Sequence, residues 1–145
     1  MNKLNQYVVV ASNSTAKIYY SSPLKHKFVL VKVLENPTGK MHKRELFDDK
    51  PSMQGNASGR HMLGMHGDPR ERSMKNFATE IGHTLEHEII KHPTENVLFV
   101  ASPRFLGILR KKLKKHCVQM KKSWHAKDLV KVSDKLLYEY LSAAT

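Results

Sequence analysis

Arginine and histidine side chains gather in one stretch of the chain, between residues 60 and 72. They are Arg60, His61, His66, Arg70 and Arg72. Guanidinium groups bind phosphate oxygens through two parallel N–H donors. The N-terminus of a helix, predicted here at Asp68-Pro69, also favours an anion. We therefore interpret this group as a candidate phosphate-binding site. The alternative is that Arg60 holds the segment in place by pairing with Asp48 or Asp49.

A second group of cations follows on a helix that the pattern predicts over residues 103–115. Phe105, Leu106, Leu109 and Leu113 recur at the spacing of one buried helical face. The opposite face then presents cations that phosphate contact requires, for which we select Arg104, Lys111, Lys112 and Lys115. The same pattern is also compatible with a solvated helix face that has no partner.

The remaining chemistry-bearing residues do not form a catalytic or metal site. His83 and His87 have the four-residue spacing of helical metal ligands, but Thr84 stands where a metalloprotease helix has glutamate, and no third ligand is in register. We therefore expect surface histidines and no metal or other cofactor. Cys117 is the only cysteine, so it forms no internal disulfide, and we expect a small buried thiol there.

A nuclease and a serine hydrolase are both disfavoured. Metal-dependent nucleases need several carboxylates at the central strand, yet residues 7–14 contain none, and Asp48, Asp49 and Asp68 lie elsewhere. The Gly-x-Ser-x-Gly turn of the hydrolases is also missing. We expect a domain that binds rather than catalyses.

Hydrophobic patterning predicts the elements that position these residues. Apolar and β-branched runs indicate strands at residues 7–11, 15–21, 28–34, 97–101 and 117–120. Helices are indicated at 69–91, with Asp68 as N-cap, at 103–115, and from Ser133-Asp134 to Leu141. The order β-β-β-α-β-α-β-α predicts one α/β domain over residues 1–145. Its mixed five-stranded sheet has helices on both faces, with the last two strands parallel to the first.

Between these elements the pattern weakens. A short helix is possible at residues 40–47. The following stretch, about 49–67, is rich in glycine and poor in apolar residues. Such a long segment without regular structure is usually functional or mobile, and we expect it to be flexible.

Length and charge limit the partners. A chain of 145 residues suits a single domain with its own core. A net charge of +12 favours polyanions such as RNA, DNA, ribosomes or anionic lipid, although it can also serve solubility alone. The first apolar run is too short for a secretion signal or a membrane span, which predicts a cytoplasmic protein.

Three stretches resemble a known bacterial family. They are Tyr7-Val8-Val9-Val10-Ala11 with Ala16-Lys17-Ile18-Tyr19, then Ser58-Gly59-Arg60-His61-Met62 leading to Phe77-Ala78, and finally residues 98–110 followed by Lys127-Asp128-Leu129. Together they resemble the family "protein required for attachment to host cells" over nearly the whole chain. The resemblance implies a ribonuclease H-like fold, related to the middle domain of archaeal and eukaryotic class-1 release factors and Pelota. Arg110, which ends the most specific stretch, is interpreted as structural.

This resemblance orders the functional hypotheses. It implies a partner in translation, so the first hypothesis is a non-enzymatic domain that binds RNA or the ribosome. The second is an interaction protein, with a protein partner, that contributes indirectly to attachment to host cells. The third is a release or rescue factor with peptidyl-tRNA hydrolase activity. It is weakened because the Gly-Gly-Gln tip of release factors is absent: this chain has Gln54-Gly55, Gly59-Arg60 and Gly64-Met65-His66-Gly67 instead.

Overall fold

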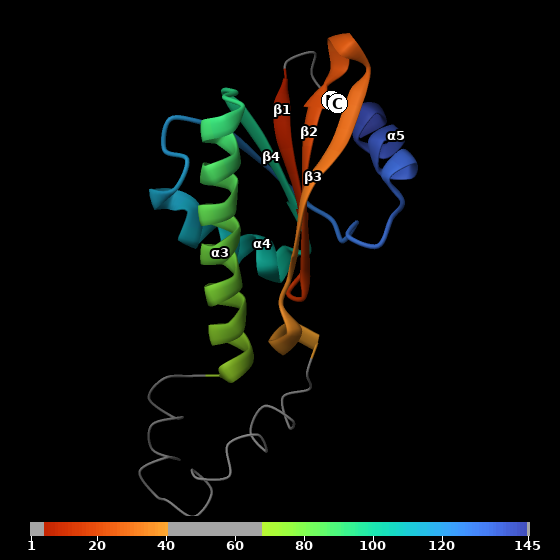
Figure 1. The fold of residues 1–145 in the computed structure, drawn as a ribbon. Coiled ribbons are helices and arrows are strands. Elements are labelled where there is room, and N and C mark those ends of the chain that lie inside the picture. Colours follow the sequence, from red (N-terminus) through yellow and green to blue (C-terminus); the bar gives the residue numbers. More distant parts are fainter. Residues whose placement is uncertain (1–4, 41–67, 145) are drawn as a thin grey trace, which may run out of the picture.

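Strand β1 (Gln6–Ala11) runs through the centre of a five-stranded sheet in the computed structural model, which describes residues 5–40 and 68–144 (Figure 1). All six of its residues are buried. Tyr7 and Val9 pack into the core on one face of the sheet, whereas Val8 and Val10 pack into the core on the other. Successive side chains of a strand point to opposite faces, so a continuous apolar run is what a strand covered on both sides requires.

The other strands extend the sheet in both directions from β1. They are β2 (Thr15–Ser22), β3 (Lys27–Glu35), β4 (Asn96–Ala101) and β5 (Lys121–Ala126), in the order β3-β2-β1-β4-β5. The first three form an antiparallel meander, in which a short 3-10 turn (Pro23–Lys25) joins β2 to β3. Strand β4 is parallel to β1, and β5 is parallel to β4, as predicted.

Within the described residues, three α-helices cover the two faces of the sheet. Helix α3 (Pro69–Lys91) and helix α4 (Pro103–Lys112) pack on one face, and α5 (Asp134–Ala144) lies alone on the other (Figure 1). The buried stripe of α3 includes Met74, Phe77, Ile81 and Leu85, which recur at helical spacing as expected. The protein is thus a single α/β domain with a mixed five-stranded sheet and helices on both faces.

The predicted fifth strand is wrong in position. Residues 117–120 form a tight turn, in which Cys117 has a positive φ of 52° and its carbonyl accepts from the Met120 amide at 3.0 Å. The strand follows immediately as β5, whose burial alternates only weakly. Lysines at an exposed sheet edge are common because they discourage pairing with other chains. Because β5 begins with lysines, its hydrophobic pattern is too weak to predict a strand there.

The second predicted helix also ends earlier than expected. Helix α4 stops at Lys112, and residues Leu113–Lys115 continue as a 3-10 turn, η4. The tighter winding is common at helix C-termini. It matters because it changes the direction in which the last cations of the segment project.

Some predictions concern residues that the structure does not describe. The short helix predicted at 40–47 lies there apart from Lys40, which ends a 3-10 turn (Pro37–Lys40). The whole glycine-rich stretch at 49–67 also lies there. Among the described helices, none has the length and apolar character needed to cross a membrane.

Candidate nucleic-acid interface

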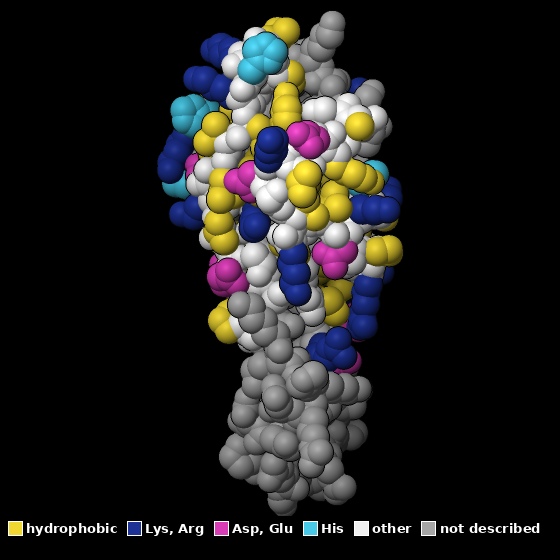
Figure 2. All heavy atoms as spheres, turned by 90° about the vertical axis from the view of Figure 1, so that its right-hand side faces the viewer, with side chains coloured by type: hydrophobic (Ala, Val, Ile, Leu, Met, Phe, Trp, Pro, Cys, Tyr) yellow, Lys and Arg dark blue, Asp and Glu magenta, His cyan; other side chains and the backbone are white. Residues whose placement is uncertain are grey.

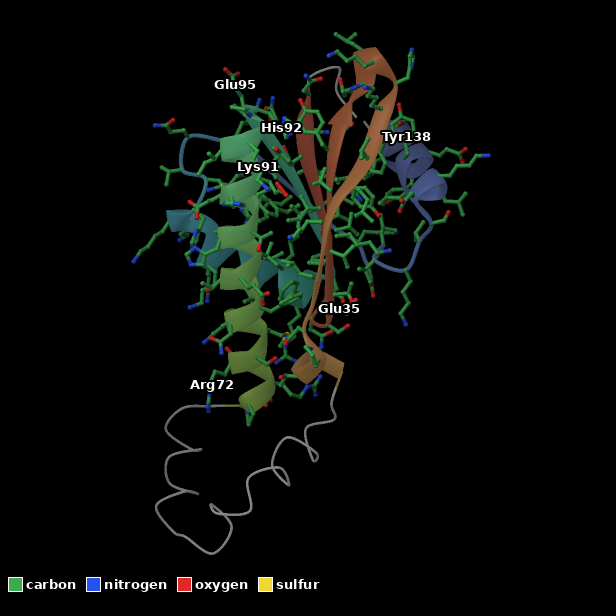
Figure 3. All side chains as sticks on the ribbon, in the orientation of Figure 1. Glu35, Arg72, Lys91, His92, Glu95 and Tyr138 are labelled. Carbon is green, nitrogen blue, oxygen red and sulfur yellow. The ribbon has the colours of Figure 1, made fainter. Side chains whose placement is uncertain are left out.

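The first turn of α3 is built as the sequence predicts. Asp68 is the N-cap: its carboxylate accepts a hydrogen bond from the Arg70 amide at 2.8 Å, and Pro69 occupies the first helical position. Arg70 and Arg72 are both exposed in this turn, and Arg72 projects from the lower end of α3 in Figure 3. The Arg70 amide is therefore not available to a phosphate, and the exposed guanidinium groups of Arg70 and Arg72 are the charged donors at this point.

A groove between α3 and α4 brings the strongest group of cations together. It has a volume of about 510 Å³ and is lined by Glu71, Lys75, Arg104, Gly107, Ile108, Lys111 and Lys112. Arg104 and Lys111 face it from successive parts of α4 because helical residues seven apart lie on one side. We call this feature the α3–α4 groove. It unites Arg104, Lys111 and Lys112, all selected from the sequence, with Lys75, which was not.

The α3–α4 groove has an open floor and an excess of positive charge. A side chain added at Gly107 would meet no atom within 4 Å. Glu71 forms an i,i+4 ion pair with Lys75 at 3.3 Å, with both side chains about half exposed. In the part of the chain that the structure describes, Arg104, Lys111 and Lys112 have no acidic partner within ion-pair distance. The cost of desolvating a phosphate in the groove is therefore offset by Arg104, Lys111 and Lys112, none of which forms an ion pair with a carboxylate of the described residues.

The other selected residues do not line this groove. Arg70 and Arg72 flank the groove residue Glu71 in the first turn of α3. Lys115 is exposed in η4, beyond the end of α4. Arg60, His61 and His66 lie outside the described residues. The structure therefore brings three of the nine selected residues together in one groove.

Two further cations hold the fold together instead. The Arg110 guanidinium lies 5.4 Å from the centroid of the Trp124 ring, which itself stacks on Phe99 in the core. This cation–π contact fastens α4 to β5. Lys122 Nζ donates to the Leu113 carbonyl at 2.9 Å and so fixes η4 above the sheet.

The face of the molecule that carries α5 has a different character. Figure 2 shows its lysines and arginines scattered among hydrophobic and acidic side chains rather than gathered in one group. The edge strand β3 also exposes apolar side chains, Val29, Leu30, Val31 and Val33. The surface is therefore not uniformly basic, and the α3–α4 groove is a local concentration of positive charge.

The C-terminal edge of β1 carries a second hollow, of about 500 Å³. Ser12, Asn13 and Ser14 line it together with Lys17 and Lys131, and Asp128 is its only acid among the described residues. A single carboxylate does not provide the paired ligands that two-metal nucleases use.

His83 and Cys117 are placed as follows. His83 is exposed and its neighbours are Glu86 and His116, not His87. The sequence offered no signal for this arrangement because Glu86 and His116 lie 30 residues apart. Cys117 is buried, and its burial, together with the nearby Glu86 carboxylate, raises the pKa of the thiol to about 11. It is therefore an unreactive thiol at neutral pH.

Comparison with known proteins gives one family and a distant structural similarity. The curated proteins include no significant match. Among solved structures, the chain is similar to the ethanolamine utilization protein EutJ from Carboxydothermus hydrogenoformans, with 12% sequence identity and a TM-score of 0.47. The similarity covers 87% of this chain and 45% of EutJ, so the chain spans less than half the length of that protein.

The family comparison covers nearly the whole domain. Residues 7–141 match the model of the family described as "protein required for attachment to host cells", from the first core strand to the last helix. The match includes every element that builds the α3–α4 groove. The chain therefore belongs to the family of proteins required for attachment to host cells.

Proposed function

We propose that this protein is a non-enzymatic, cytoplasmic RNA-binding domain whose α3–α4 groove contacts the phosphate backbone. The observation that carries the proposal is the convergence of Arg104, Lys111 and Lys112 on an open groove, where no carboxylate of the described residues neutralises them. Cations on one surface release condensed counterions when they meet a nucleic acid, and this release drives association without reading sequence.

Two further observations support this proposal. The net charge of +12 supplies long-range attraction for a polyanion. The exposed Arg70 and Arg72 extend the basic surface from the groove around the start of α3. The resemblance to release-factor middle domains favours ribosomal RNA as the source of the phosphates. Because the Gly-Gly-Gln tip is absent from the sequence, we assign no peptidyl-tRNA hydrolysis.

The sharpest test changes the charge on the floor of the groove. Gly107→Glu places a carboxylate in open space, and Gly107→Gln adds a side chain of the same size without charge. We expect Gly107→Glu to weaken binding of a fluorescent single-stranded RNA about tenfold or more in an anisotropy titration at low salt. Gly107→Gln should bind within about twofold of the parent protein. Equal affinities for the two variants would contradict a phosphate site in the groove.

A matched pair of double variants separates the groove from net charge. Lys111→Ala with Lys112→Ala removes two groove cations, whereas Lys131→Ala with Lys135→Ala removes two exposed cations near or on α5. The first pair should reduce the slope of log K against log salt by about 0.7 for each phosphate that the groove no longer neutralises. The second should leave it unchanged. Equal effects of the two pairs would show that binding depends on overall charge rather than on the groove. Co-sedimentation with ribosomes tests separately whether the ribosome supplies the RNA.

A second candidate function follows from the family description. In that case the domain contributes to attachment to host cells through a protein partner, and the same surfaces would serve protein recognition. A strain that carries only Gly107→Glu distinguishes the two. Normal attachment combined with a loss of RNA binding would place the attachment role outside the α3–α4 groove.

A further inference from the structure

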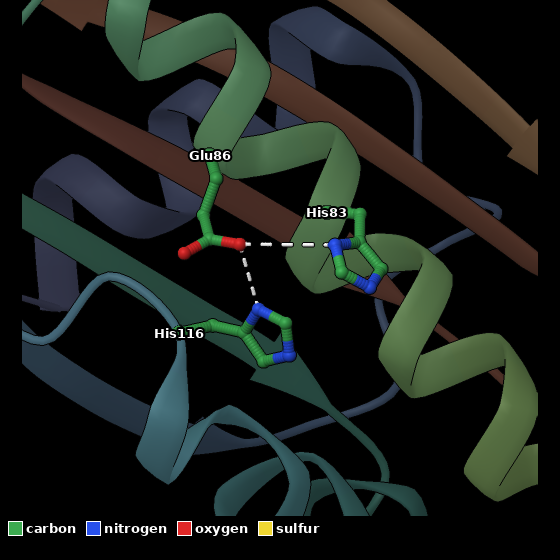
Figure 4. A group of neighbouring side chains, drawn as sticks. All are labelled: His83, Glu86 and His116. Carbon is green, nitrogen blue, oxygen red and sulfur yellow. Dashed lines mark hydrogen bonds and ion pairs between the residues drawn. The ribbon is translucent and has the colours of Figure 1, made fainter.

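A three-residue cluster lies where α3 faces the segment after α4 (Figure 4), further along the helix than the groove-lining residues Glu71 and Lys75. His83 and Glu86 are one turn apart on α3, and His116 follows η4. One ligand atom from each, two imidazole nitrogens and a carboxylate oxygen, lies within 4.8 Å of the others. We propose that these residues form a binding site for a divalent zinc-like cation, independent of the RNA-binding proposal.

The fold brings His116 unusually close to α3. A Cβ at Gly82 would lie 2.6 Å from Leu113 Cδ2 and 3.0 Å from His116 Cγ, so the missing side chain of glycine leaves room for these two side chains against α3. The chain then reverses at Cys117, a non-glycine residue with positive φ. Backbone conformations of this kind are costly and often mark functional positions.

Glu86 is oriented so that one oxygen is available to the cluster. Its Oε2 accepts a hydrogen bond from the Cys117 amide at 3.3 Å, while its Oε1 lies 2.7 Å from His116 Nδ1 and 3.9 Å from His83 Nδ1. The amide thus acts as an outer-shell partner that fixes the carboxylate, an arrangement typical of metal sites.

The distances are close to those that a tetrahedral ion needs. Zinc bonds of about 2.0–2.2 Å to nitrogen and oxygen place neighbouring ligand atoms about 3.3 Å apart. Occupation therefore requires the Glu86–His116 pair to open by about 0.6 Å and His83 Nδ1 to approach Glu86 Oε1 by about 0.6 Å. The ligand nitrogens of His83 and His116, which lie within 4.8 Å of each other, must also come to about 3.3 Å. The His83 side chain is 69% exposed and can make this movement, whereas His116, 16% exposed, is held by its surroundings.

The ligand chemistry selects the ion. Two imidazoles and one carboxylate suit Zn²⁺, and Ca²⁺ and Mg²⁺ are disfavoured because they prefer all-oxygen sites. The ion would take the place of the hydrogen bond between His116 Nδ1 and Glu86 Oε1. With three protein ligands at a partly exposed position, water completes the coordination. Bound metal would cross-link the middle of α3 to the segment between α4 and β5.

Calorimetric titration of metal-free, untagged protein with ZnCl₂ tests the proposal. We expect one ion per chain and a rise in the thermal midpoint with zinc, because a ligand of the native state stabilises it. His83→Ala, an exposed change that should not disturb folding, should weaken zinc binding by at least about 100-fold, and so should Glu86→Gln. No binding to the parent protein would overturn the site.

His87 provides the matched control. It is exposed on the same helix, four residues after His83, but does not belong to the cluster. His87→Ala should bind zinc within about twofold of the parent. The protein has nine histidines and one cysteine, so binding that survives His83→Ala and Glu86→Gln would place the ion elsewhere and overturn the assignment. Cys117→Ala should bind zinc as the parent does.

Discussion

Helix α3 meets the chain that follows β4 in two places, and these differ in the way a glycine is used. At Gly82 the neighbouring segment is so close that a methyl group has no room, whereas at Gly107 a side chain would enter open space. The closed contact brings Leu113 and His116 onto α3, and the open one leaves the floor of the α3–α4 groove. Glycine lowers helix stability at both positions. Only at Gly82 does close packing account for the absence of a side chain.

The strongest test of this comparison is Gly82→Ala. The new methyl group must displace the buried Leu113 side chain, and overpacking of this kind costs about 1–3 kcal/mol. The better helix propensity of alanine returns about 1 kcal/mol. We expect a net loss of up to about 2 kcal/mol in the free energy of unfolding, measured by urea denaturation. A variant more stable than the parent by about 1 kcal/mol, the full gain in helix propensity, would show that the contact is not closed.

The upper end of α3 offers a second test through Tyr7. Its hydroxyl oxygen lies 2.9 Å from the Glu88 carbonyl oxygen and 2.8 Å from the His92 carbonyl oxygen, so its single hydrogen is shared between these two acceptors at the helix end. Tyr7→Phe leaves both carbonyls without this donor and should cost about 1 kcal/mol by the same measurement.

The same residue predicts an alkaline limit to stability. Burial, with the nearby Glu88 carboxylate, raises the pKa of Tyr7 to about 12 from its usual value of about 10. A folded-state pKa above the unfolded value means that its contribution is complete below about pH 10 and is lost as the pH rises toward about 12. The difference in stability between the parent and Tyr7→Phe should therefore shrink across this interval. A difference that is constant from about pH 9 to about pH 12 would contradict the assignment.

Gly107→Ala is expected to act in the opposite direction from Gly82→Ala. With no atom to displace, only the gain in helix propensity remains, so the variant should be more stable by about 0.5–1 kcal/mol. It should also retain zinc binding, which Gly82→Ala should impair by moving His116. Destabilisation by Gly107→Ala would mean that the groove is filled.

The smallest effect on stability is expected at the start of α3. Arg70→Ala with Arg72→Ala changes two exposed residues, so the free energy of unfolding should change by at most about 0.5 kcal/mol. RNA affinity should nevertheless fall, with a smaller salt slope. If RNA affinity stays at the parent level, the basic surface ends at the groove.

Local patterns were sufficient for most of the elements. Short stretches of sequence predict three features correctly. They are strand β1, from its continuous valine run, the start of α3, from Asp68-Pro69, and the buried face of α3, from its apolar stripe. Cys117–Met120 and β5 show the limit of such patterns. The hydrophobic pattern predicted a strand at this turn and did not predict β5, because an edge strand with one weakly covered face need not be apolar.

The candidate sites divide in the same way. Sequence alone identified the cations of α4, since charge and helical spacing are local properties, and it established the absence of acids from the first strand. Tertiary structure decided that Arg104, Lys111 and Lys112 share a groove with Lys75, and that His83 meets Glu86 and His116 rather than His87. These groupings depend on where α3 crosses the chain after β4. That crossing is set by side-chain packing between distant segments, which no local pattern encodes.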